Sequence, residues 1–423
     1  MTPRSTGLGS CSTRPSRQRA PGPPMHRTPI DAPIGGSDRR LFLAGMAAFA
    51  GAAGAAGAAG AASAPQVAVP GAAPAPGGAP HRHSFRLSAV APQLVTPAGT
   101  RTQATVREFP ALRGMSLYKL AIEPGCFREP HWHANADELG YCTAGELIVT
   151  MFSTGNQRDM FRVQAGEMYL VPSGSFHSLE NVGPGRAEVI AAFSHESPED
   201  FGLSGAVGSM SAPVMGNAWG MEASELDGIV RRPVDIVFGR SDGAADPPPP
   251  AAANRWKFGV EAVKPMIVND FGSARLARAD AWPALRTQSM YSLRLKGTGM
   301  REPHWHPETA EMGYVLAGRS RMTIKSPHDG PASVDTYELG PGDMYFIPKG
   351  YPHHIENLVS DELRFLIFFD RSMPEDIGYT GGIPTFPRRI VAPTLGVTEA
   401  ELPRYPDVAS DAMIVRKRNP VAP

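Results

Sequence analysis

The sequence predicts an all-β protein built from two tandem double-stranded β-helix (jelly-roll) barrels with short helical extensions. The hexapeptide REPHWH occurs twice in the chain, at Arg128–His133 and at Arg301–His306. A repeat with a period of more than 170 residues indicates two whole domains rather than a solenoid. Glycine and proline are abundant, with 45 and 43 among 423 residues, which favours short strands joined by turns over a helical bundle.

The two copies match well beyond the hexapeptide. Phe109–His133 aligns with Trp282–His306 without a gap, and Gly166–Asn181 aligns with Gly342–Asn357. Segments such as Ser116–Glu123 are rich in residues that fill a half-buried sheet, and glycines mark the turns between them. We therefore expect each copy to form a closed barrel of short strands.

The composition changes at several points along the chain, and these points set the expected domain limits. A proline run within Ser241–Asn254 is typical of a semi-stiff linker, and a Pro/Ala/Gly stretch precedes the first copy. We expect an export signal over 1–64, a linker over 65–83, the first barrel over 84–240, a proline-rich linker over 241–254, the second barrel over 255–418 and a tail over 419–423.

The N-terminal segment resembles a twin-arginine export signal. Arg39 and Arg40 are followed by Leu41, Phe42 and Leu43, in the pattern Ser/Thr-x-Arg-Arg-x-Phe-Leu. The alternative is a transmembrane anchor. The Ala/Gly run that follows buries little apolar area per residue, so we expect no stable membrane insertion. The resemblance implies a periplasmic or extracellular protein.

Charge and cysteine content exclude several classes of partner and fold. The 41 acidic and 41 basic residues leave no bulk field that would attract nucleic acid or an anionic membrane. The three cysteines fit neither a disulfide framework nor a CxxC metal site. We expect Cys126 and Cys142 to be small buried hydrophobic residues.

The histidines of the hexapeptide have the spacing of metal ligands. Two histidines at i and i+2 on a strand point to the same face, a glutamate five residues later begins the returning strand, and a further histidine follows a P-x-G-x-x-H turn. Three imidazoles and one carboxylate make a divalent-metal site that leaves two positions of an octahedral ion open. The alternative is a set of satisfied core histidines, but both copies have complete sets. The expected ligands are His131, His133, Glu138 and His177 in the first copy, and His304, His306, Glu311 and His353 in the second.

These residues fall within the two motifs of the cupin superfamily, which the chain resembles. The first copy reads Gly125-x5-His131-x-His133-x4-Glu138-x6-Gly145, then Gly166-x5-Pro172-x-Gly174-x2-His177-x3-Asn181. The second copy matches except that Thr298 stands where the first glycine belongs. The resemblance covers most of 84–232 and 256–418.

Duplicated cupins with REPHWH or close variants resemble oxalate decarboxylases. That resemblance implies an enzyme that uses two Mn²⁺ ions per chain, with dioxygen as co-catalyst, to split oxalate into formate and carbon dioxide. Fe²⁺ is the alternative metal. The matching arginines, Arg128 and Arg301, would grip the small carboxylate substrate at a strand edge or bulge. In the alternative interpretation each arginine pairs with a neighbouring acid.

The proton donor of that family has no single clear counterpart in this sequence. The family has a lid with a glutamate after the last strand of the first cupin, and here Glu199 or Asp200 is near that place. The same stretch also predicts a helix start, with Ser197 as N-cap and Pro198 at the first position. The second copy repeats it in Met373–Gly381, which favours scaffold over lid. Without a donor, oxalate would be oxidised, as in the germin-like oxalate oxidases.

Two further functions stay open at this point. One is an Fe-dependent bicupin dioxygenase acting on a larger aromatic substrate. The other is a non-catalytic metal-storage protein, which the complete ligand sets in both copies disfavour. The family resemblance implies a homo-oligomer, a trimer or hexamer, with Glu222–Arg232 and Glu399–Tyr405 as expected contacts between subunits.

Overall fold

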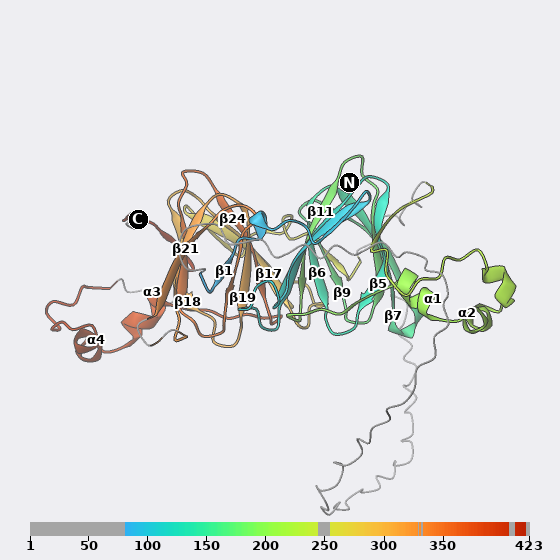
Figure 1. The fold of residues 1–423 in the computed structure, drawn as a ribbon. Coiled ribbons are helices and arrows are strands. Elements are labelled where there is room, and N and C mark those ends of the chain that lie inside the picture. The colour runs from blue at the N-terminus through green and yellow to red at the C-terminus, as the bar shows by residue number, and fades with distance from the viewer. Residues whose placement is uncertain (1–80, 244–253, 329, 331–332, 406–410, 420–423) are drawn as a thin grey trace, which may run out of the picture. The chain divides into compact units, whose positions relative to one another are not determined.

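The computed structural model describes residues 81–243, 254–328, 330, 333–405 and 411–419. The predicted export signal and most of the proline-rich linker lie outside these residues. Within them the chain is mostly β, with two sheets in each half of the molecule (Figure 1). The predicted all-β fold with two jelly-roll barrels is therefore confirmed.

The first barrel consists of a seven-stranded and a six-stranded sheet. The first sheet has the order β14-β9-β6-β11-β4-β3-β2, with β14 (Lys257–Phe258), β9 (Met168–Val171), β6 (Glu138–Ala144), β11 (Ala187–Phe193), β4 (Ser116–Ile122), β3 (Gly99–Ala104) and β2 (Leu94–Thr96). The second has the order β12-β5-β10-β7-β8, with β12 (Asp200–Gly202), β5 (Cys126–His133), β10 (Phe176–Asn181), β7 (Glu146–Ser153), β8 (Gln157–Gln164), and β13 (Phe238–Arg240) beside β5.

The second barrel repeats this arrangement. Its seven-stranded sheet has the order β1-β22-β19-β24-β17-β16-β15, with β1 (Ser84–Phe85), β22 (Met344–Ile347), β19 (Glu311–Ala317), β24 (Leu363–Phe369), β17 (Ser289–Leu295), β16 (Gly272–Ala277) and β15 (Ile267–Asn269). Its other sheet has the order β21-β20-β23-β18-β25, with β21 (Val334–Leu339), β20 (Ser320–Lys325), β23 (His353–Asn357), β18 (Gly299–Trp305), β25 (Ile377–Gly378), and β26 (Ile414–Arg416) beside β18.

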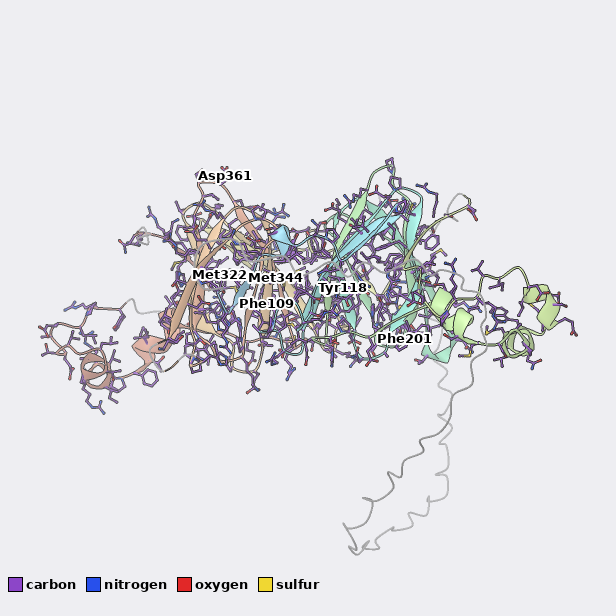
Figure 2. The ribbon with its side chains drawn as sticks, in the orientation of Figure 1. Phe109, Tyr118, Phe201, Met322, Met344 and Asp361 are labelled. Atoms are coloured by element: carbon purple, nitrogen blue, oxygen red, sulfur yellow. The ribbon has the colours of Figure 1, made fainter. Side chains whose placement is uncertain are left out.

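Buried apolar side chains form two clusters, one that joins both barrels and includes Met344, and one inside the second barrel that includes Met322; both residues are labelled in Figure 2. Met322 and Met344 are fully buried, whereas Phe201 on the outer face is 46% exposed. Burying one large apolar side chain stabilises the fold by about 1.5–3 kcal/mol, so each barrel rests on its core rather than on any single polar residue. Cys126 and Cys142 are both free and buried, as predicted.

A β-bulge shapes the hexapeptide strand in both barrels. Along β5, Arg128 pairs with Leu179 and His131 with His177, so three steps on β5 match two on β10. The extra residue lies at Glu129–Pro130, where proline has no N–H to donate to the ladder. As a result Arg128 and His131, although an odd number of residues apart, are both buried. The same shift occurs in β18 between Arg301 and His304.

The two barrels exchange their N-terminal arms. Strand β1, which precedes the first barrel, pairs with β22 of the second. Strand β14, which precedes the second barrel, pairs with β9 of the first. The arms are reciprocal, because Ser84 lies opposite Tyr345 and Lys257 opposite Tyr169. The sequence pattern did not indicate this exchange.

The predicted helix start at Ser197 is wrong. Residues 194–199 form bends and irregular chain, and Asp200 begins β12, which pairs with β5. The backbone follows β5 because this pairing satisfies strand hydrogen bonds that an isolated helical turn would leave unmade. The helices begin later: α1 (Leu203–Ser209), α2 (Ala212–Trp219) and η3 (Ala223–Leu226) in the first half, and α3 (Tyr379–Gly382), η4 (Ile383–Thr385) and α4 (Arg388–Thr394) in the second, with η1 (Leu87–Ala89) and η2 (Thr154–Asn156) elsewhere.

None of the helices within the described residues is long and apolar enough to cross a membrane.

Candidate metal centres

Three histidines and one glutamate meet inside the first barrel. His131 and His133 lie on β5, Glu138 is the first residue of β6, and His177 lies on β10. Each offers a ligand atom, and these atoms all lie within 4.8 Å of one another. All four side chains are buried, between 1% and 3% exposed.

The second barrel assembles the matching set. His304 lies on β18, His306 directly after it, Glu311 begins β19 and His353 begins β23. Their ligand atoms also lie within 4.8 Å of one another, and all four residues are buried. The structure therefore brings together both groups of residues that the spacing in the sequence singled out.

A tight turn places the last histidine of each set. Gly174 and Gly350 have φ angles of 75° and 79°, which glycine adopts without strain. Their backbone N–H groups donate to the carbonyls of His133 and His306, both at 2.8 Å. These bonds fasten the P-x-G-x-x-H turn to the hexapeptide strand, so the third imidazole faces the other two.

Backbone carbonyls orient all six imidazoles. In each ring Nδ1 lies 2.7–3.2 Å from a main-chain oxygen. A histidine that donates Nδ1–H to a carbonyl keeps its lone pair on Nε2, which is how metal-ligating histidines are held. The acceptors are the carbonyls of Glu129, Glu199 and Ser175 in the first barrel, and of Glu302, Glu375 and Tyr351 in the second.

The glutamate of each set is oriented by a buried tyrosine. The hydroxyl of Tyr169 donates to Oε1 of Glu138 at 2.5 Å, and Tyr345 does the same to Glu311. Gly140 makes room for this ring, because a Cβ there would lie 2.1 Å from Tyr169. Burial and the neighbouring carboxylate raise the pKa of Tyr169, so it stays a donor.

The donor set fits a divalent cation. Oε2 of Glu138 lies 3.0 Å from Nε2 of His133 and 3.3 Å from Nε2 of His177. With Nδ1 protonated, each of these contacts sets a nitrogen lone pair against a carboxylate oxygen. Such an arrangement is repulsive unless a cation lies between the atoms. In the second barrel Nε2 of His353 is buried and makes no hydrogen bond, which leaves it available as a ligand.

The electrostatics keep two of the histidine ligands in their neutral, metal-binding form. Burial and the neighbouring Arg128 cation hold the pKa of His131 well below its usual range, and His304 behaves alike beside Arg301. Neutral imidazole and ionised carboxylate are the forms that bind metals.

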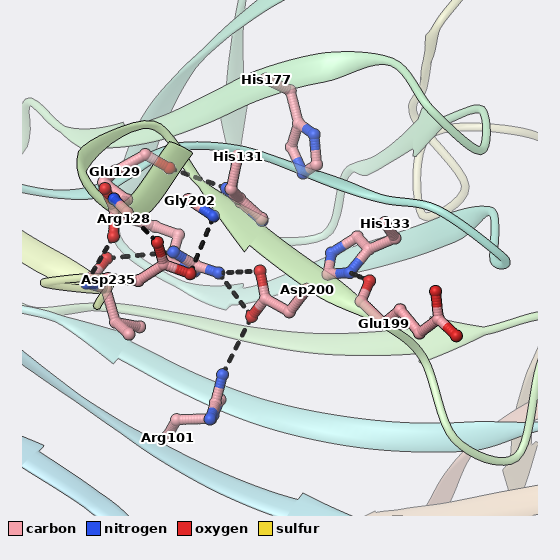
Figure 3. A network of polar contacts seen from close by, with 12 residues as sticks. Arg101, Arg128, Glu129, His131, His133, His177, Glu199, Asp200, Gly202 and Asp235 are labelled. Carbon is pink, nitrogen blue, oxygen red and sulfur yellow. Dashed lines mark hydrogen bonds and ion pairs between the residues drawn. The ribbon is translucent and has the colours of Figure 1, made fainter. Parts of the chain in front are cut away.

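Arg128 is held in an ion pair rather than lying free at the mouth of the barrel. Its Nη2 atom lies 2.6 Å from both carboxylate oxygens of Asp200, and Nη1 donates to the carbonyl of Val237 at 3.2 Å (Figure 3). Arg101 contacts the same carboxylate at 3.0 Å. The alternative interpretation, in which the arginine pairs with a neighbouring acid, describes this geometry.

Asp200 does not have the surroundings of a proton donor. Burial alone would raise its pKa, but Arg128, His133 and Arg101 lower it overall. A carboxylate that is ionised and bridges two arginines carries no proton to give at neutral pH. The geometry therefore argues against Asp200 in that role.

Glu199 contacts the centre through its backbone. Its carbonyl accepts a hydrogen bond from Nδ1 of His133 at 3.2 Å, while its carboxylate extends beyond the ring (Figure 3). The Glu199 residue is exposed. The side chain therefore has access to solvent protons but no hydrogen bond to a metal-ligand residue among those described.

In the second barrel Arg301 pairs with Asp376 and donates to the carbonyl of Met413. Asp376 Oδ1 also lies 2.9 Å from Nδ1 of His306, although the hydrogen bond from that nitrogen points to the Glu375 carbonyl. Burial alone would lower the pKa of His306, but Asp376 and Glu311 raise it to about 9.

Sequence reasoning missed three residues that build the first site. The carboxylate of Glu129 accepts from the backbone N–H groups of Val237 and Ser204, at 2.6 and 3.0 Å. Asp235 accepts from Gly202 at 2.8 Å, which ties down the strand that carries Asp200. Arg101 is the third. The repetition of glutamate in both REPHWH segments was a signal for Glu129, but no local pattern marks Asp235 or Arg101.

Fold and site together define a metal-binding protein with two double-stranded β-helix barrels. A cupin family model matches residues 85–227 and 258–402. The chain belongs to the cupin family, as its motifs predicted.

The relatives of the chain include enzymes of oxalate metabolism. Oxalate decarboxylase OxdC of Bacillus subtilis (strain 168) is 25% identical over 301 residues, which cover 69% of this chain and 77% of the relative. Oxalate oxidase GF-2.8 of Triticum aestivum is 34% identical over 109 residues, covering 24% of this chain and 49% of the relative. The chain is thus an oxalate decarboxylase-like bicupin.

Solved structures show the same architecture. Oxalate decarboxylase from Bacillus subtilis at pH 4.6 matches with a TM-score of 0.69 at 22% identity, covering 81% of this chain and 89% of that one. A second structure of that enzyme, with a TM-score of 0.69 at 22% identity and covering 81% of this chain and 90% of that one, concerns its Mn(II) centres. At this identity the likeness establishes the fold.

Proposed function

We propose that the protein is a manganese-dependent enzyme that converts oxalate to formate and carbon dioxide. The observation that carries the proposal is the pair of complete three-histidine, one-glutamate centres, each with a buried arginine on the same strand. The kinship with oxalate decarboxylases of similar length supports it. Manganese and Fe²⁺ are both compatible with nitrogen and oxygen ligands, and the Mn(II) centres of the related enzyme favour manganese.

The charge around the first centre suits a small dianion. Arg128 and Arg101 are both directed at Asp200, which compensates only one of the two cations. Together with a divalent ion and Glu138, this leaves the filled site positive. An oxalate dianion would be drawn to such a site electrostatically, and the buried surroundings strengthen the attraction.

A bound divalent ion would supply the Lewis-acid and redox chemistry that activates oxalate. The chain has to supply orientation and one proton: the C–C bond of the oxalate dianion breaks, carbon dioxide leaves, and the supplied proton joins the remaining carbon to give formate. Arg128 orients the substrate carboxylate electrostatically. Glu199 is exposed, and its backbone carbonyl contacts the ligand His133, so it remains the proposed proton donor of the first barrel.

One observation favours oxidation of oxalate as a second candidate. The segments after the last barrel strand, Phe193–Asp200 and Phe369–Asp376, have equal length and both run into a strand beside the hexapeptide. The segment that would form a lid over the first barrel therefore has an equivalent of the same length in the second barrel. Without a delivered proton, dioxygen would accept the two electrons and yield peroxide and two carbon dioxide molecules.

One assay separates these candidates. Natively purified protein is analysed for manganese, iron, zinc and copper, then incubated with oxalate in air and under nitrogen. Formate with equimolar carbon dioxide supports decarboxylation, and peroxide supports oxidation. Neither product from protein that contains about two manganese ions per chain would contradict both, and would leave the storage protein or a dioxygenase with another substrate.

We also propose export by the twin-arginine route, in line with Arg39 and Arg40 in a segment outside the described residues. Zn²⁺ and Cu²⁺ bind nitrogen and oxygen sites more tightly than Mn²⁺. Folding before export would let manganese enter first. Replacing residues 1–64 by a signal for unfolded chains should yield protein rich in zinc or copper. Equal manganese content from both forms would contradict this.

A homo-oligomer, trimer or hexamer, is proposed as the working assembly. The helical extensions expose apolar side chains that a lone chain would leave in water. Trp219, Val230, Phe386 and Leu395 are each at least 48% exposed. Light scattering on the wild type and on Trp219→Ser with Phe386→Ser tests the proposal: a monomeric wild type contradicts it.

A further inference from the structure

A cavity of about 660 Å³ lies where the two barrels meet. Its walls come from β3, β4, β6 and β11 of the first barrel, from β19 and β24 of the second, and from η1 of the exchanged arm. None of the eight proposed metal ligands lines it. Its volume is that of a site for a small organic molecule.

The charged groups of this cavity are mostly basic. Lys119, Arg186 and Arg364 line it together with a single acid, Glu188. The side chain of Lys119 makes no hydrogen bond or ion pair with any residue that the structure describes. Arg186 contacts Glu123 at 3.4 Å, and Arg364 lies 3.9 Å from Glu362. Nε of Arg364 is buried and makes no hydrogen bond, so an acceptor is missing there.

In the opposite half of the interface between the barrels, a glutamate occupies the position that corresponds to Ser88 of the cavity. The exchanged arms put Glu261 at the position that corresponds to Ser88, because β14 and β1 pair with matching residues of the two barrels. The Glu261 carboxylate accepts from Ser292 at 2.5 Å and pairs with Arg294 at 2.6 Å. In that half, a protein carboxylate neutralises the cations.

In the half that contains the cavity, Ser88 stands where the other half has Glu261, and Lys119 stands where the other half has Ser292. Ser88 carries no charge, and its hydroxyl donates to Asp343 at 2.5 Å. Lys119 occupies the position that corresponds to Ser292 in the gapless alignment of the two copies. One half thus has an acid and its partners, while the other has an open space beside Lys119, which has no partner among the described residues, and Arg364 Nε, which makes no hydrogen bond.

We propose that this cavity binds a small di- or tricarboxylate that bridges the two barrels. One carboxylate contacts Lys119, in the role that Glu261 has in the other half, and a second reaches the Arg364 side. The hydroxyl groups of Thr102, Thr143 and Tyr314 on the wall provide further hydrogen bonds. Because both barrels contribute, occupancy stabilises the joined protein.

Calorimetric titration of the metal-loaded full chain tests the proposal. Succinate and tricarballylate are the probes, inorganic phosphate the comparison anion, and ionic strength and metal content are held constant. We expect one site per chain. Lys119→Met should weaken binding about tenfold or more, since it removes a charge-assisted hydrogen bond. Ser88→Glu should abolish binding by supplying the missing carboxylate. Lys349→Met, an exposed lysine outside the lining, should bind like the wild type.

Three results would overturn the proposal. The first is no binding of either acid at millimolar concentration. The second is binding that Lys119→Met leaves unchanged, including binding that disappears with the metal and so belongs to the metal centres. The third is binding of phosphate alone, which would exclude a carboxylate as the natural ligand. If Ser88→Glu does not fold by circular dichroism, the Lys119→Met result decides by itself.

Discussion

The two barrels present the same four metal-binding side chains but surround them with different charge. In the first barrel Asp200 lies between Arg128 and Arg101. In the second barrel Asp376 lies between Arg301 and the proposed ligand His306. The cause is one position in the opposite sheet, because Ala274 of β16 stands where the first barrel has Arg101 on β3.

This difference separates metal affinity from substrate affinity. The second centre has one positive charge fewer than the first. A carboxylate oxygen of Asp376 also lies close to Nδ1 of His306, the ring nitrogen that faces away from the other ligands. The second centre should therefore hold a divalent cation more tightly than the first. The first centre is more positive once filled and should attract an anionic substrate more strongly. We therefore expect the first barrel to turn over oxalate and the second to retain metal.

Removing one histidine from each barrel should give the largest effect. His133→Ala and His306→Ala should each lower the metal content from about two ions per chain to about one, as counted by elemental analysis. Oxalate turnover should fall about 100-fold or more in His133→Ala. Loss of a residue that only hydrogen-bonds to a metal ligand already lowers activity by up to about 100-fold, and loss of the ligand itself should lower it at least as much. His306→Ala should keep most of its turnover.

Circular dichroism serves as the control for both variants, because the apolar core should keep each barrel folded. A loss of both metals from either variant would mean that the centres depend on each other. Turnover that falls only in His306→Ala would reverse the assignment of roles to the barrels.

The aspartates should differ in their effect on stability. Asp200→Asn leaves two arginines without their carboxylate, one of them only 3% exposed, and should cost about 3–5 kcal/mol. Asp376→Asn removes the carboxylate from a single arginine, Arg301, and from the edge of His306, and should cost less, about 1–3 kcal/mol. Urea unfolding of both variants measures the difference, with the exposed Asp270, as Asp270→Asn, for a surface control. Equal losses would show that Arg101 contributes nothing to the pair.

The metal ligands could be read from the sequence because they are local. His131 and His133 share a strand face, and the P-x-G turn brings in His177, so spacing alone indicated a four-residue set. The partners of these residues could not be read in this way. Arg101 is 27 positions before Arg128 in the chain, and only the order of strands places both beside Asp200.

Two errors have a common physical cause. The stretch around Ser197 has the local signals of a helix start, yet the open edge of β5 recruits Asp200–Gly202 as a strand. Long-range pairing therefore overrode local propensity. The exchanged arms likewise depend on which barrel offers a free strand edge, and two short segments, β1 and β14, carry no pattern that identifies their partner.

Arg101→Ala should make the first centre resemble the second. In the wild type, excess EDTA should remove metal faster from the first barrel than from the second. In Arg101→Ala the rate of release from the first barrel should fall toward that of the second. This rate should fall about three- to fivefold, since Arg101 is partly exposed and its charge is screened by solvent. KM for oxalate should rise by a similar factor. Unchanged release and unchanged KM would contradict the charge argument.

A smaller effect distinguishes the two halves of the interface between the barrels. Burial alone would raise the pKa of Glu261, but Ser292 and Arg294 lower it below the usual value of 4.5. A depressed pKa means that Glu261 adds stability above pH 4.5 and loses that contribution as the pH falls through its folded pKa. Glu261→Gln should cost about 1 kcal/mol at pH 7 and close to nothing in stronger acid. Thermal unfolding from pH 7 to pH 3 checks this, and a constant difference over that range would contradict it.

The smallest effect is expected at Ser197, where the second barrel already provides the comparison. Met373 stands at the corresponding position, cannot cap a helix, and is nevertheless followed by the same entry into a strand, β25. Ser197 itself is exposed, and its hydrogen bonds to the described residues use its backbone N–H and carbonyl, which contact His195 and Asn135. Ser197→Ala should therefore change stability by less than about 0.5 kcal/mol, as for an ordinary surface substitution. A helix N-cap would lose about 1 kcal/mol. Since the Ser197 hydroxyl also touches no metal-ligand residue among those described, formate production should stay at the wild-type rate; a loss of turnover at unchanged stability would show that this segment moves over the first centre during catalysis.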